Sequence, residues 1–401
     1  MPDSDVGVSS VEAAEKNADR KAWLIISGEY PPKRGGVADY SSLIARELSR
    51  AGDVVRVVAP RPIEMIQDAR VGDVAVHWVA GRFGWRALCE LERVLRQGEK
   101  STLLVQYVPH AYGYKAMNVL FCLWLWMHRK QDVRVMFHEV AYPIRPGQKR
   151  THRVLAQVTR AMARLVASAS TVIYVAIPEW ERALHECGVP GNARIILLPV
   201  PSCLASDAYL AAEPLQHLRR AGSEARRVVG HFGTYSEDIV SLLIPVISLL
   251  VEVEPVITMV LLGRNAERVS MQLKAQGVSE ERVQCVGALA PDRVREAMLA
   301  CDVMCQPYPD GVSARRTSTM AALALGIPVV TTAGSLTDAV WEDEKAVCLA
   351  PVADAEAMLG AIVALLANDA ARRELGARGN ELYERQFAVK HTIARLRGET
   401  P

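Results

Sequence analysis

Three features are missing from this 401-residue sequence, and each absence argues against a class of protein. None of the eight cysteines belongs to a CxxC pair, which indicates reduced, buried side chains of a cytoplasmic protein rather than a disulfide framework. The net charge is only +2 and no basic tract is dense enough to follow a nucleic-acid backbone, so we expect no nucleic-acid partner. Residues 1–20 are polar and acidic without the apolar core of a secretion signal, and we expect a disordered tail there.

Long apolar runs are also missing. The most apolar stretch, 119–127, ends at the basic tripeptide 128–130, well short of the roughly 20 residues that a membrane-spanning helix needs. We expect a buried helix. The alternative is a peripheral contact at the inner membrane, in which Phe121, Trp124 and Trp126 enter the membrane surface beside a lipid-linked acceptor.

The sequence does contain short apolar strands that alternate with amphipathic helices in two successive blocks. Strands are expected at 23–27, 54–59, 74–78, 103–106, 133–138, 172–175 and 195–198, and then at 228–232, 258–262, 283–286, 303–306, 329–332 and 347–349. A chain of this length exceeds what one core supports, and such alternation implies parallel sheets covered on both faces. The predicted fold class is α/β, with two Rossmann-like doubly wound parallel-sheet domains that face each other across a cleft.

The expected domain boundaries follow from composition. The N-terminal domain is predicted at 21–205, the C-terminal domain at 227–385, and a C-terminal helix or tail at 386–401. Between them, the linker 206–226 has small and charged residues but no strand periodicity, and the prolines from 199 onward extend this hinge region. Ligands of open parallel sheets bind at the carboxyl ends of the strands, so the crevice between the domains is the expected site.

The segment 306–332 is the most informative part of the chain. Directly before an Ala/Leu-rich helical run it places Asp310, Gly311, Ser313, Arg315, Arg316, Thr317 and Ser318. The first N–H groups of a helix have no intrahelical partner and carry the positive end of its dipole, and two guanidiniums add to that attraction for anions. This segment therefore predicts a phosphorylated ligand.

Two glycine loops lie at corresponding places in the two blocks. Gly35 and Gly36 follow the first strand of the first block, and Gly233 and Thr234 follow the first strand of the second. Glycine lets backbone approach a ligand closely, although a simple turn explains each loop equally well.

A histidine ends one of the predicted strands. His138, followed by Glu139, comes directly after 133–137, where an imidazole can exchange a proton or donate a hydrogen bond. A histidine satisfied within the core is an equally weighted alternative. His110 and Tyr112 lie on the preceding strand-end loop, and for them we expect packing roles.

In this order, the motifs resemble retaining glycosyltransferases of family 4, which have the GT-B fold. The residues that carry the resemblance are 29–40, 137–139, 229–234, 261–264 and 307–332, and the similarity runs from about 23 to about 387. It implies that the C-terminal domain binds a nucleotide-diphosphate sugar, with Gly233 and Thr234 facing the phosphates, Arg264 near the nucleotide and Leu289 in the segment whose backbone reads the base.

The resemblance also assigns residues of the N-terminal domain. That domain supplies the acceptor side, Gly35 and Gly36 abut the donor diphosphate and sugar, and His138 orients the donor sugar near the reacting centre. The acceptor it implies is a hydroxyl of a polysaccharide or a lipid-linked glycan.

The central acidic motif departs from the family pattern. The family has two glutamates separated by seven residues, whereas here Asp310 stands for the first and Ser318 follows eight residues later. Aligned backwards from the later Gly-Ile-Pro, the two positions fall on Ser313 and Ala321, so in neither register are both acids kept. This marks a subgroup with a modified motif.

The positive charges are displaced as well. The arginine and lysine usual after Gly230 are missing, and Arg315 and Arg316 are the expected substitutes that stabilise the leaving diphosphate. Asp310 would contact sugar hydroxyls, and the neighbouring residues of the helix start would bind the donor. No metal is required in this scheme, and the only small molecule it needs is the nucleotide sugar itself.

Two other functions remain open from the sequence. A same-fold phosphorylase or nucleotide-sugar epimerase would use the same phosphate site for another reaction. The modified acidic motif and the missing lysine also fit a non-catalytic GT-B partner protein.

Overall fold

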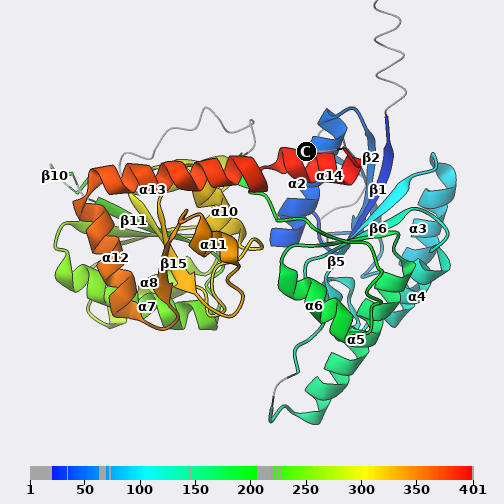
Figure 1. Ribbon diagram of the computed structural model, residues 1–401, viewed down its shortest axis with the longest axis horizontal. Coiled ribbons are helices and arrows are strands. Elements are labelled where there is room, and N and C mark those ends of the chain that lie inside the picture. Colours follow the sequence, from blue (N-terminus) through cyan, green and yellow to red (C-terminus); the bar gives the residue numbers. More distant parts are fainter. Residues whose placement is uncertain are drawn as a thin grey trace, which may run out of the picture. The chain divides into compact units, whose positions relative to one another are not determined.

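The computed structural model describes residues 20–33, 35–62, 69–71, 74–144, 146–205, 218, 220–221, 224–225 and 227–399. The chain divides into two compact units (Figure 1). The first comprises Met1–Leu198 with Thr392–Pro401, and the second comprises Pro199–His391. Apart from Arg20, the predicted tail at 1–20 lies outside the described residues.

The first unit contains an eight-stranded sheet in the order β3-β4-β2-β1-β5-β6-β7-β8. Its strands are β1 (Ala22–Ser27), β2 (Val54–Pro60), β3 (Ala69–Val71), β4 (Val74–Val79), β5 (Thr102–Tyr107), β6 (Val133–Phe137), β7 (Val172–Val175) and β8 (Ile195–Leu197). All pairings are parallel except that of the edge strand β3 with β4. The chain reverses its direction of winding between β1 and β5, and this switch point is where doubly wound sheets bind ligands.

Helices cover both faces of this sheet, which explains why its central strand β1 is apolar along most of its length (Figure 1). They are α2 (Gly36–Arg50), α3 (Trp85–Gln97), α4 (Val119–Met127), α5 (Arg150–Ala169) and α6 (Pro178–Glu186). Leu24, Ile25 and Ile26 of β1, for example, are fully buried on both sides.

The second unit contains a six-stranded, fully parallel sheet in the order β13-β12-β11-β14-β15-β16. Its strands are β11 (Arg227–Phe232), β12 (Ile257–Leu262), β13 (Val283–Gly287), β14 (Val303–Gln306), β15 (Val329–Ala333) and β16 (Cys348–Pro351). Its helices are α7 (Glu237–Val253), α8 (Ala266–Ala275), α9 (Pro291–Leu299), α10 (Thr317–Ala324), α11 (Ala339–Asp343), α12 (Ala355–Ala367) and α13 (Asp369–Leu382). This is the Rossmann strand order, with its switch point between β11 and β14. The predicted fold class of two Rossmann-like parallel-sheet units is confirmed.

The division between the units falls at Leu198/Pro199, seven residues before the predicted end of the first domain at 205. The prolines after 198 belong to the second unit because the Val200 N–H donates to the Ala314 carbonyl at 3.1 Å and the Ser202 N–H donates to Tyr383 Oη at 3.1 Å. Within the predicted linker 206–226, two short strands, β9 (Arg220–Ala221) and β10 (Glu224–Ala225), pair antiparallel. The bonds of Val200 and Ser202 reach residues more than a hundred positions away, so local composition does not reveal them.

The last helix, α14 (Val389–Arg397), returns the chain to the first unit. Its Arg397 guanidinium pairs with the Asp53 carboxylate, and both side chains are buried. Asp53 also accepts hydrogen bonds from the Lys21 N–H at 3.0 Å and from Trp23 Nε1 at 2.9 Å. The C-terminal segment, predicted as a helix or tail at 386–401, is thus held to β1 and the start of β2 by a buried ion pair.

Candidate functional site

The switch point of the second unit is lined by a buried histidine that the sequence interpretation did not single out. His231 lies at the carboxyl end of β11, and its Nδ1 donates to the Cys305 carbonyl of β14 at 2.8 Å, which ties together the two strands that flank the switch point. Its Nε2 is buried and has no hydrogen-bond partner among the described residues. Since Nδ1 carries the proton, Nε2 presents a lone pair that only a donor from outside this set can satisfy.

The loop after β14 holds the predicted charged cluster together. Each carboxylate oxygen of Asp310 accepts a hydrogen bond from one arginine, Oδ2 from Arg315 and Oδ1 from Arg316. The Arg316 guanidinium also lies 4.3 Å from the centre of the Tyr308 ring, in a cation–π arrangement. One carboxylate against two guanidiniums leaves one positive charge uncompensated within the cluster, as an anion site requires.

Backbone bonds to the end of β15 fix the course of this loop. Tyr308 N donates to Thr332 Oγ1 at 2.8 Å, Val312 N donates to the Thr332 carbonyl at 2.9 Å, and Leu336 N donates to the Asp310 carbonyl at 2.8 Å. Gly311 has φ +84°, and a Cβ there would lie 2.4 Å from the Gly334 nitrogen. Only glycine fits, so the position of Asp310 is set by packing against Gly334.

The helix start behind the cluster is α10, with Arg316 at its N-cap and no side-chain cap among the described residues. Thr317 and Ser318 open the helix, and the Ser318 hydroxyl lies 2.8 Å from Tyr308 Oη. Ser313 is fully buried, and its hydroxyl has no hydrogen-bond partner in the described part of the chain. The structure therefore brings Asp310, the arginines and the first turn of α10 together at one edge.

The second glycine loop lies at the same edge of the sheet. The Gly233 N–H donates to the Leu262 carbonyl at 3.0 Å, and the Gly263 N–H donates to the Gly287 carbonyl at 2.7 Å. These bonds join the carboxyl ends of β11, β12 and β13. Thr234 accepts from Asn265 Nδ2 through its carbonyl at 3.1 Å.

The remaining predicted donor residues flank these loops. Arg264 follows Gly263 with an exposed side chain, and Leu289, two residues after Gly287, is half-buried.

Gly263 is where this loop system is most sensitive to a side chain. It has φ +112°, and a Cβ there would lie 2.0 Å from the Gly233 carbonyl oxygen. We expect Gly263→Ala to lower the free energy of unfolding of the second unit by roughly 2 kcal/mol or more, through strain and collision together. Gly277→Ala is the matched control in urea unfolding, because Gly277 has φ +88° but no described atom within 4 Å of its Cβ position. Equal losses for the two variants would contradict the close approach of Gly263 to Gly233.

His138 pairs with a glutamine in the first unit. Its Nε2 lies 2.8 Å from Gln106 Oε1, at the carboxyl end of β5, and its ring meets Tyr40 edge-on at 5.0 Å between centroids. Burial lowers the pKa of His138 to about 4, so it acts as a neutral hydrogen-bonding group near pH 7. The nearby Glu139 carboxylate raises this pKa, but burial outweighs it. Glu139 Oε2 also lies 3.4 Å from His110 Nδ1.

Gln106 was missed by the sequence interpretation. A polar residue inside the otherwise apolar stretch 103–107 was its only sign. Tyr112 packs as expected, since it is buried and its hydroxyl donates to the carbonyls of Gln106 and Ile26.

The glycines at the start of α2 differ in what surrounds them. A Cβ on Gly35 would lie 3.0 Å from Glu29 Oε2, whereas a Cβ on Gly36 would meet no described atom within 4 Å. The described neighbours therefore do not require glycine at 36.

The buried histidines make stability depend on pH. Burial lowers the pKa of His231 to about 4, against 6.5 for an unfolded histidine. Between these values the unfolded chain takes up a proton that the folded chain does not, so stability falls as pH drops from 6.5 to 4, by roughly 3 kcal/mol. We expect His231→Gln to remove this contribution to the pH dependence of the free energy of unfolding, measured by urea unfolding between pH 4 and 6.5. His138→Gln is the counterpart in the first unit, and a slope unchanged in both variants would contradict neutral burial.

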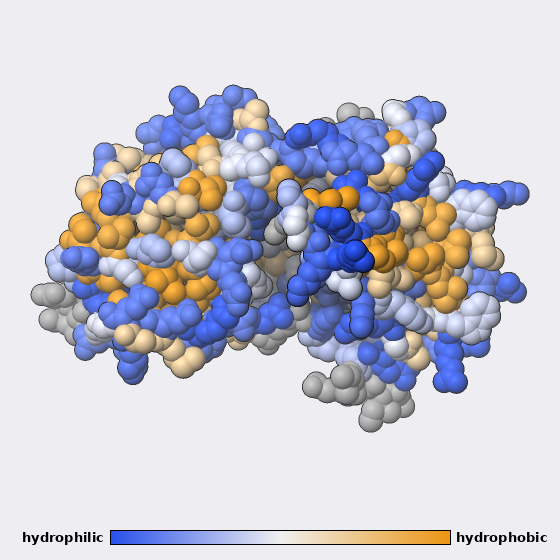
Figure 2. All heavy atoms as spheres, turned by 90° about the horizontal axis from the view of Figure 1, so that it is seen from below, coloured by the Kyte–Doolittle hydropathy of each residue, from blue (hydrophilic) through white to orange (hydrophobic). Residues whose placement is uncertain are grey.

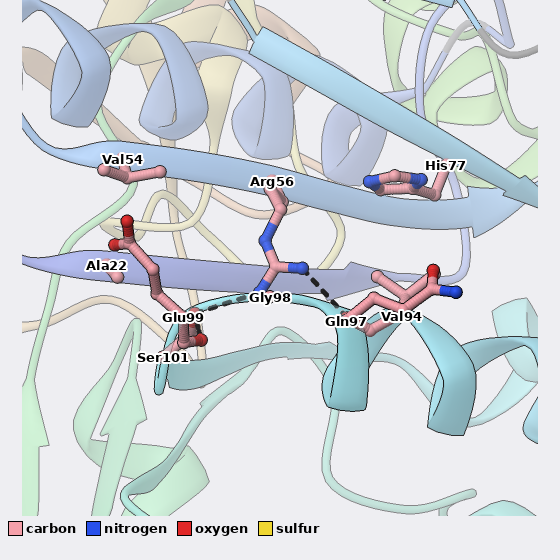
Figure 3. A pocket seen from close by; sticks show the side chains of 9 residues that line it. All are labelled: Ala22, Val54, Arg56, His77, Val94, Gln97, Gly98, Glu99 and Ser101. Carbon is pink, nitrogen blue, oxygen red and sulfur yellow. Dashed lines mark hydrogen bonds between the residues drawn. The ribbon is translucent and has the colours of Figure 1, made fainter.

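One cavity of the first unit lies away from the carboxyl ends of the strands, where ligands are expected (Figure 3). Its volume is about 450 Å³, and Ala22 and Val54, the first residues of β1 and β2, place it at the amino edge of the sheet. Arg56 crosses it and donates to the Val94 carbonyl at 2.9 Å and to Ser101 Oγ at 3.1 Å. These contacts hold the guanidinium against the end of α3, which indicates a structural role.

The second unit matches a known family model. Residues 226–368 match the family described as glycosyl transferases group 1. The matched residues include the His231 switch point, the Gly233 loop and the Asp310 cluster.

Solved structures show the fold of the whole chain. HepE from Anabaena, in complex with UDP and glucose, is 16% identical with a TM-score of 0.64, covering 94% of this chain and 98% of that one. Sucrose-phosphate synthase from Thermosynechococcus elongatus is 17% identical with a TM-score of 0.67 and the same coverage. WaaG, a glycosyltransferase involved in lipopolysaccharide biosynthesis, is 13% identical with a TM-score of 0.62, covering 94% and 98%. The fold is therefore GT-B. No curated protein sequence matches the chain.

Among the described residues, no helix combines the length and the apolar composition that spanning a bilayer would need. These residues also contain no group of three or more His, Cys, Asp and Glu side chains placed to hold a metal ion.

Proposed function

We propose that this protein is a retaining glycosyltransferase that moves a hexose from a nucleotide-diphosphate sugar to a hydroxyl acceptor of a polysaccharide or lipid-linked glycan. The observation that carries the proposal is the Asp310–Arg315–Arg316 cluster at the start of α10, beside the switch point of a group 1 glycosyltransferase domain. The structure of HepE in complex with UDP-glucose, which has the same fold, supports a nucleotide-sugar donor.

In this proposal the arginines stabilise the leaving diphosphate. A guanidinium has five N–H donors and can hold two phosphate oxygens, and the Arg316 Nε–H has no hydrogen-bond partner among the described residues. Asp310 positions both cations before the donor arrives, so little reorganisation is needed as charge develops. Its carboxylate has lone pairs left for sugar hydroxyls, the role first expected of it.

We assign the Gly233 loop to binding of the donor phosphates. A Cβ on Gly233 would lie 3.1 Å from His231 Nε2, which faces this glycine. We assign His231 to accept a hydrogen bond from a donor hydroxyl, because its Nε2 is the unprotonated nitrogen.

The first unit is assigned the acceptor side, with Gly35 and Gly36 near the donor and His138 as a neutral hydrogen-bond group that orients the sugar. The acceptor attacks the anomeric carbon from the face that the diphosphate leaves, and configuration is retained. The scheme requires no protein nucleophile and no metal, since positioning and charge stabilisation supply the catalysis.

Nucleotide binding tests the proposal directly. A functional donor site stabilises the fold by about 2.7 kcal/mol at a hundredfold excess of ligand over Kd, so UDP, GDP or ADP should raise Tm by roughly 5–10 °C. A non-catalytic partner protein with a degenerate site predicts no shift with any of them. Nucleotide release from the matching nucleotide sugar only when an acceptor is present would then exclude a phosphorylase and an epimerase.

A further inference from the structure

Helix α4 presents an apolar face to solvent. The exposed fractions are 68% for Met127, 46% for Leu123, 41% for Val119, 38% for Trp126 and 37% for Leu120. These five positions follow helical spacing along one face, while the opposite face is buried in the core of the first unit. Of the three aromatic residues first considered for membrane contact, Phe121 and Trp124 are buried and only Trp126 is exposed.

Two exposed aromatic residues extend this face. Trp85 is 70% exposed and Tyr114 is 60% exposed. Asn118, the N-cap of α4, joins their loops to the helix, because its Nδ2 donates to the Phe83 carbonyl at 3.1 Å and the Tyr112 carbonyl at 2.8 Å. The Tyr114 hydroxyl also lies 2.8 Å from the Cβ position of Gly84, the residue before Trp85.

We define the α4 patch as Trp85, Tyr114, Val119, Leu120, Leu123, Trp126 and Met127. Figure 2 shows apolar side chains gathered on the unit that carries α4, with hydrophilic ones around them.

The charged residues of the segment that carries the patch helix are all cationic. Residues 113–131 contain no Asp or Glu, but they contain Lys115, Arg129 and Lys130, all exposed. The Arg129 guanidinium lies 3.8 Å from the centre of the Trp126 ring. The adjoining α3 carries two acids: Glu92 lies 3.1 Å from His128 and 2.9 Å from Arg96, and Glu90 accepts a hydrogen bond from the Ala80 N–H at 3.0 Å. An apolar face bordered by cations and aromatic rings complements an anionic lipid surface better than it complements a protein, whose interface rim carries both signs.

We propose that the α4 patch docks the protein on the surface of a membrane that contains anionic phospholipids. Leu123 and Met127 enter the acyl boundary, Trp85, Tyr114 and Trp126 lie at the headgroups, and Lys115, Arg129 and Lys130 bind the lipid phosphates. This deepens the proposed function, because it brings the transferase to a lipid-linked acceptor. It rests on contacts of the first unit and uses no part of the donor site.

Vesicle sedimentation tests this proposal. The protein should sediment with vesicles of equal parts phosphatidylcholine and phosphatidylglycerol, and its partition into phosphatidylcholine alone should be at least tenfold weaker. Leu123→Asp with Met127→Asp should lower the partition into anionic vesicles by a further factor of at least ten. Arg129→Glu with Lys130→Glu should lower it about tenfold and weaken its dependence on salt. The matched control is Met271→Asp, since Met271 on α8 is 64% exposed and lies outside the patch.

Three outcomes would overturn the proposal. The first is that the unmodified protein does not sediment with anionic vesicles. The second is that both double variants sediment with these vesicles as well as the unmodified protein does. The third is a dimer in sedimentation velocity that Leu123→Asp with Met127→Asp dissociates without any vesicle binding, which would make the patch an interface between two copies. The Tm shift with the nucleoside diphosphate that stabilises the unmodified protein is measured on every variant. A shift that survives loss of vesicle binding leaves the proposed function intact, whereas vesicle binding without any nucleotide shift would contradict only the transfer function.

Discussion

Alanine in place of Arg316 is expected to lower kcat/KM for sugar transfer by roughly 10²–10³-fold, the usual loss when one preorganised group that stabilises transition-state charge is removed. The loss has two sources. The variant lacks a phosphate ligand, and the Asp310 carboxylate, left with Arg315 alone, offsets the single remaining cation of the cluster. Arg315→Ala should act in the same direction. Steady-state kinetics with the nucleotide sugar identified by thermal shift measures both.

Two further variants separate charge from folding. Arg316→Lys keeps the charge but loses the planar fork, and it should fall between the unmodified protein and the alanine variant. Arg293→Ala removes an exposed arginine of α9 that pairs with Glu296, so it should leave kcat/KM unchanged. If Arg315→Ala and Arg316→Ala both transferred sugar at the unmodified rate, the assignment of the diphosphate to this cluster would be wrong.

Loss of one partner from the Asp53–Arg397 pair is expected to lower the free energy of unfolding of the first unit by about 3–5 kcal/mol. Arg397→Met leaves the Asp53 carboxylate buried with only the Lys21 N–H and Trp23 Nε1 as donors, which does not neutralise its charge. For a unit of this size the corresponding fall in Tm is roughly 6–20 °C. Calorimetry and urea unfolding measure it.

The control is an exposed ion pair of the same unit. Arg50 pairs with Glu47 at 2.7 Å on the surface of α2, and Arg50→Ala should change stability by less than about 1 kcal/mol. Replacing Asp53 and Arg397 together by leucine should cost less than either single change, because no buried charge is then left alone. A double variant as unstable as the sum of the single ones would show that the two residues do not interact.

Much of the fold follows from local patterns. Short apolar runs between amphipathic helices predict the parallel strands of both sheets, because a strand buried on both faces has to be apolar throughout. The edge strand β3 and the short pair β9 and β10 were not predicted, because their sequences contain no apolar run, unlike the equally short β8. The sequence placed the hinge region from the prolines at 199 onward, but it did not reveal that Val200 and Ser202 bond to Ala314 and Tyr383, more than a hundred residues away.

The candidate site likewise contains residues that the local sequence indicates and residues that it does not. The sequence points to Asp310, Arg315 and Arg316 because charged residues before an apolar helix are unusual, and their nearness along the chain lets them meet. Gln106 and His231 are different. Each is a single polar residue at a strand end, and nothing local indicates that one pairs with His138 and the other with the Cys305 carbonyl.

The sequence by itself determined the alternation of strands and helices, the glycine loops and the charged start of α10, all of which depend on neighbours within a few residues. The tertiary structure alone decided which polar groups meet. His138 finds Gln106 across 32 residues, His231 finds Cys305 across 74, and Arg397 finds Asp53 across 344. Strand order and register create these pairs, and both are set when the whole core packs, so no stretch of sequence contains them.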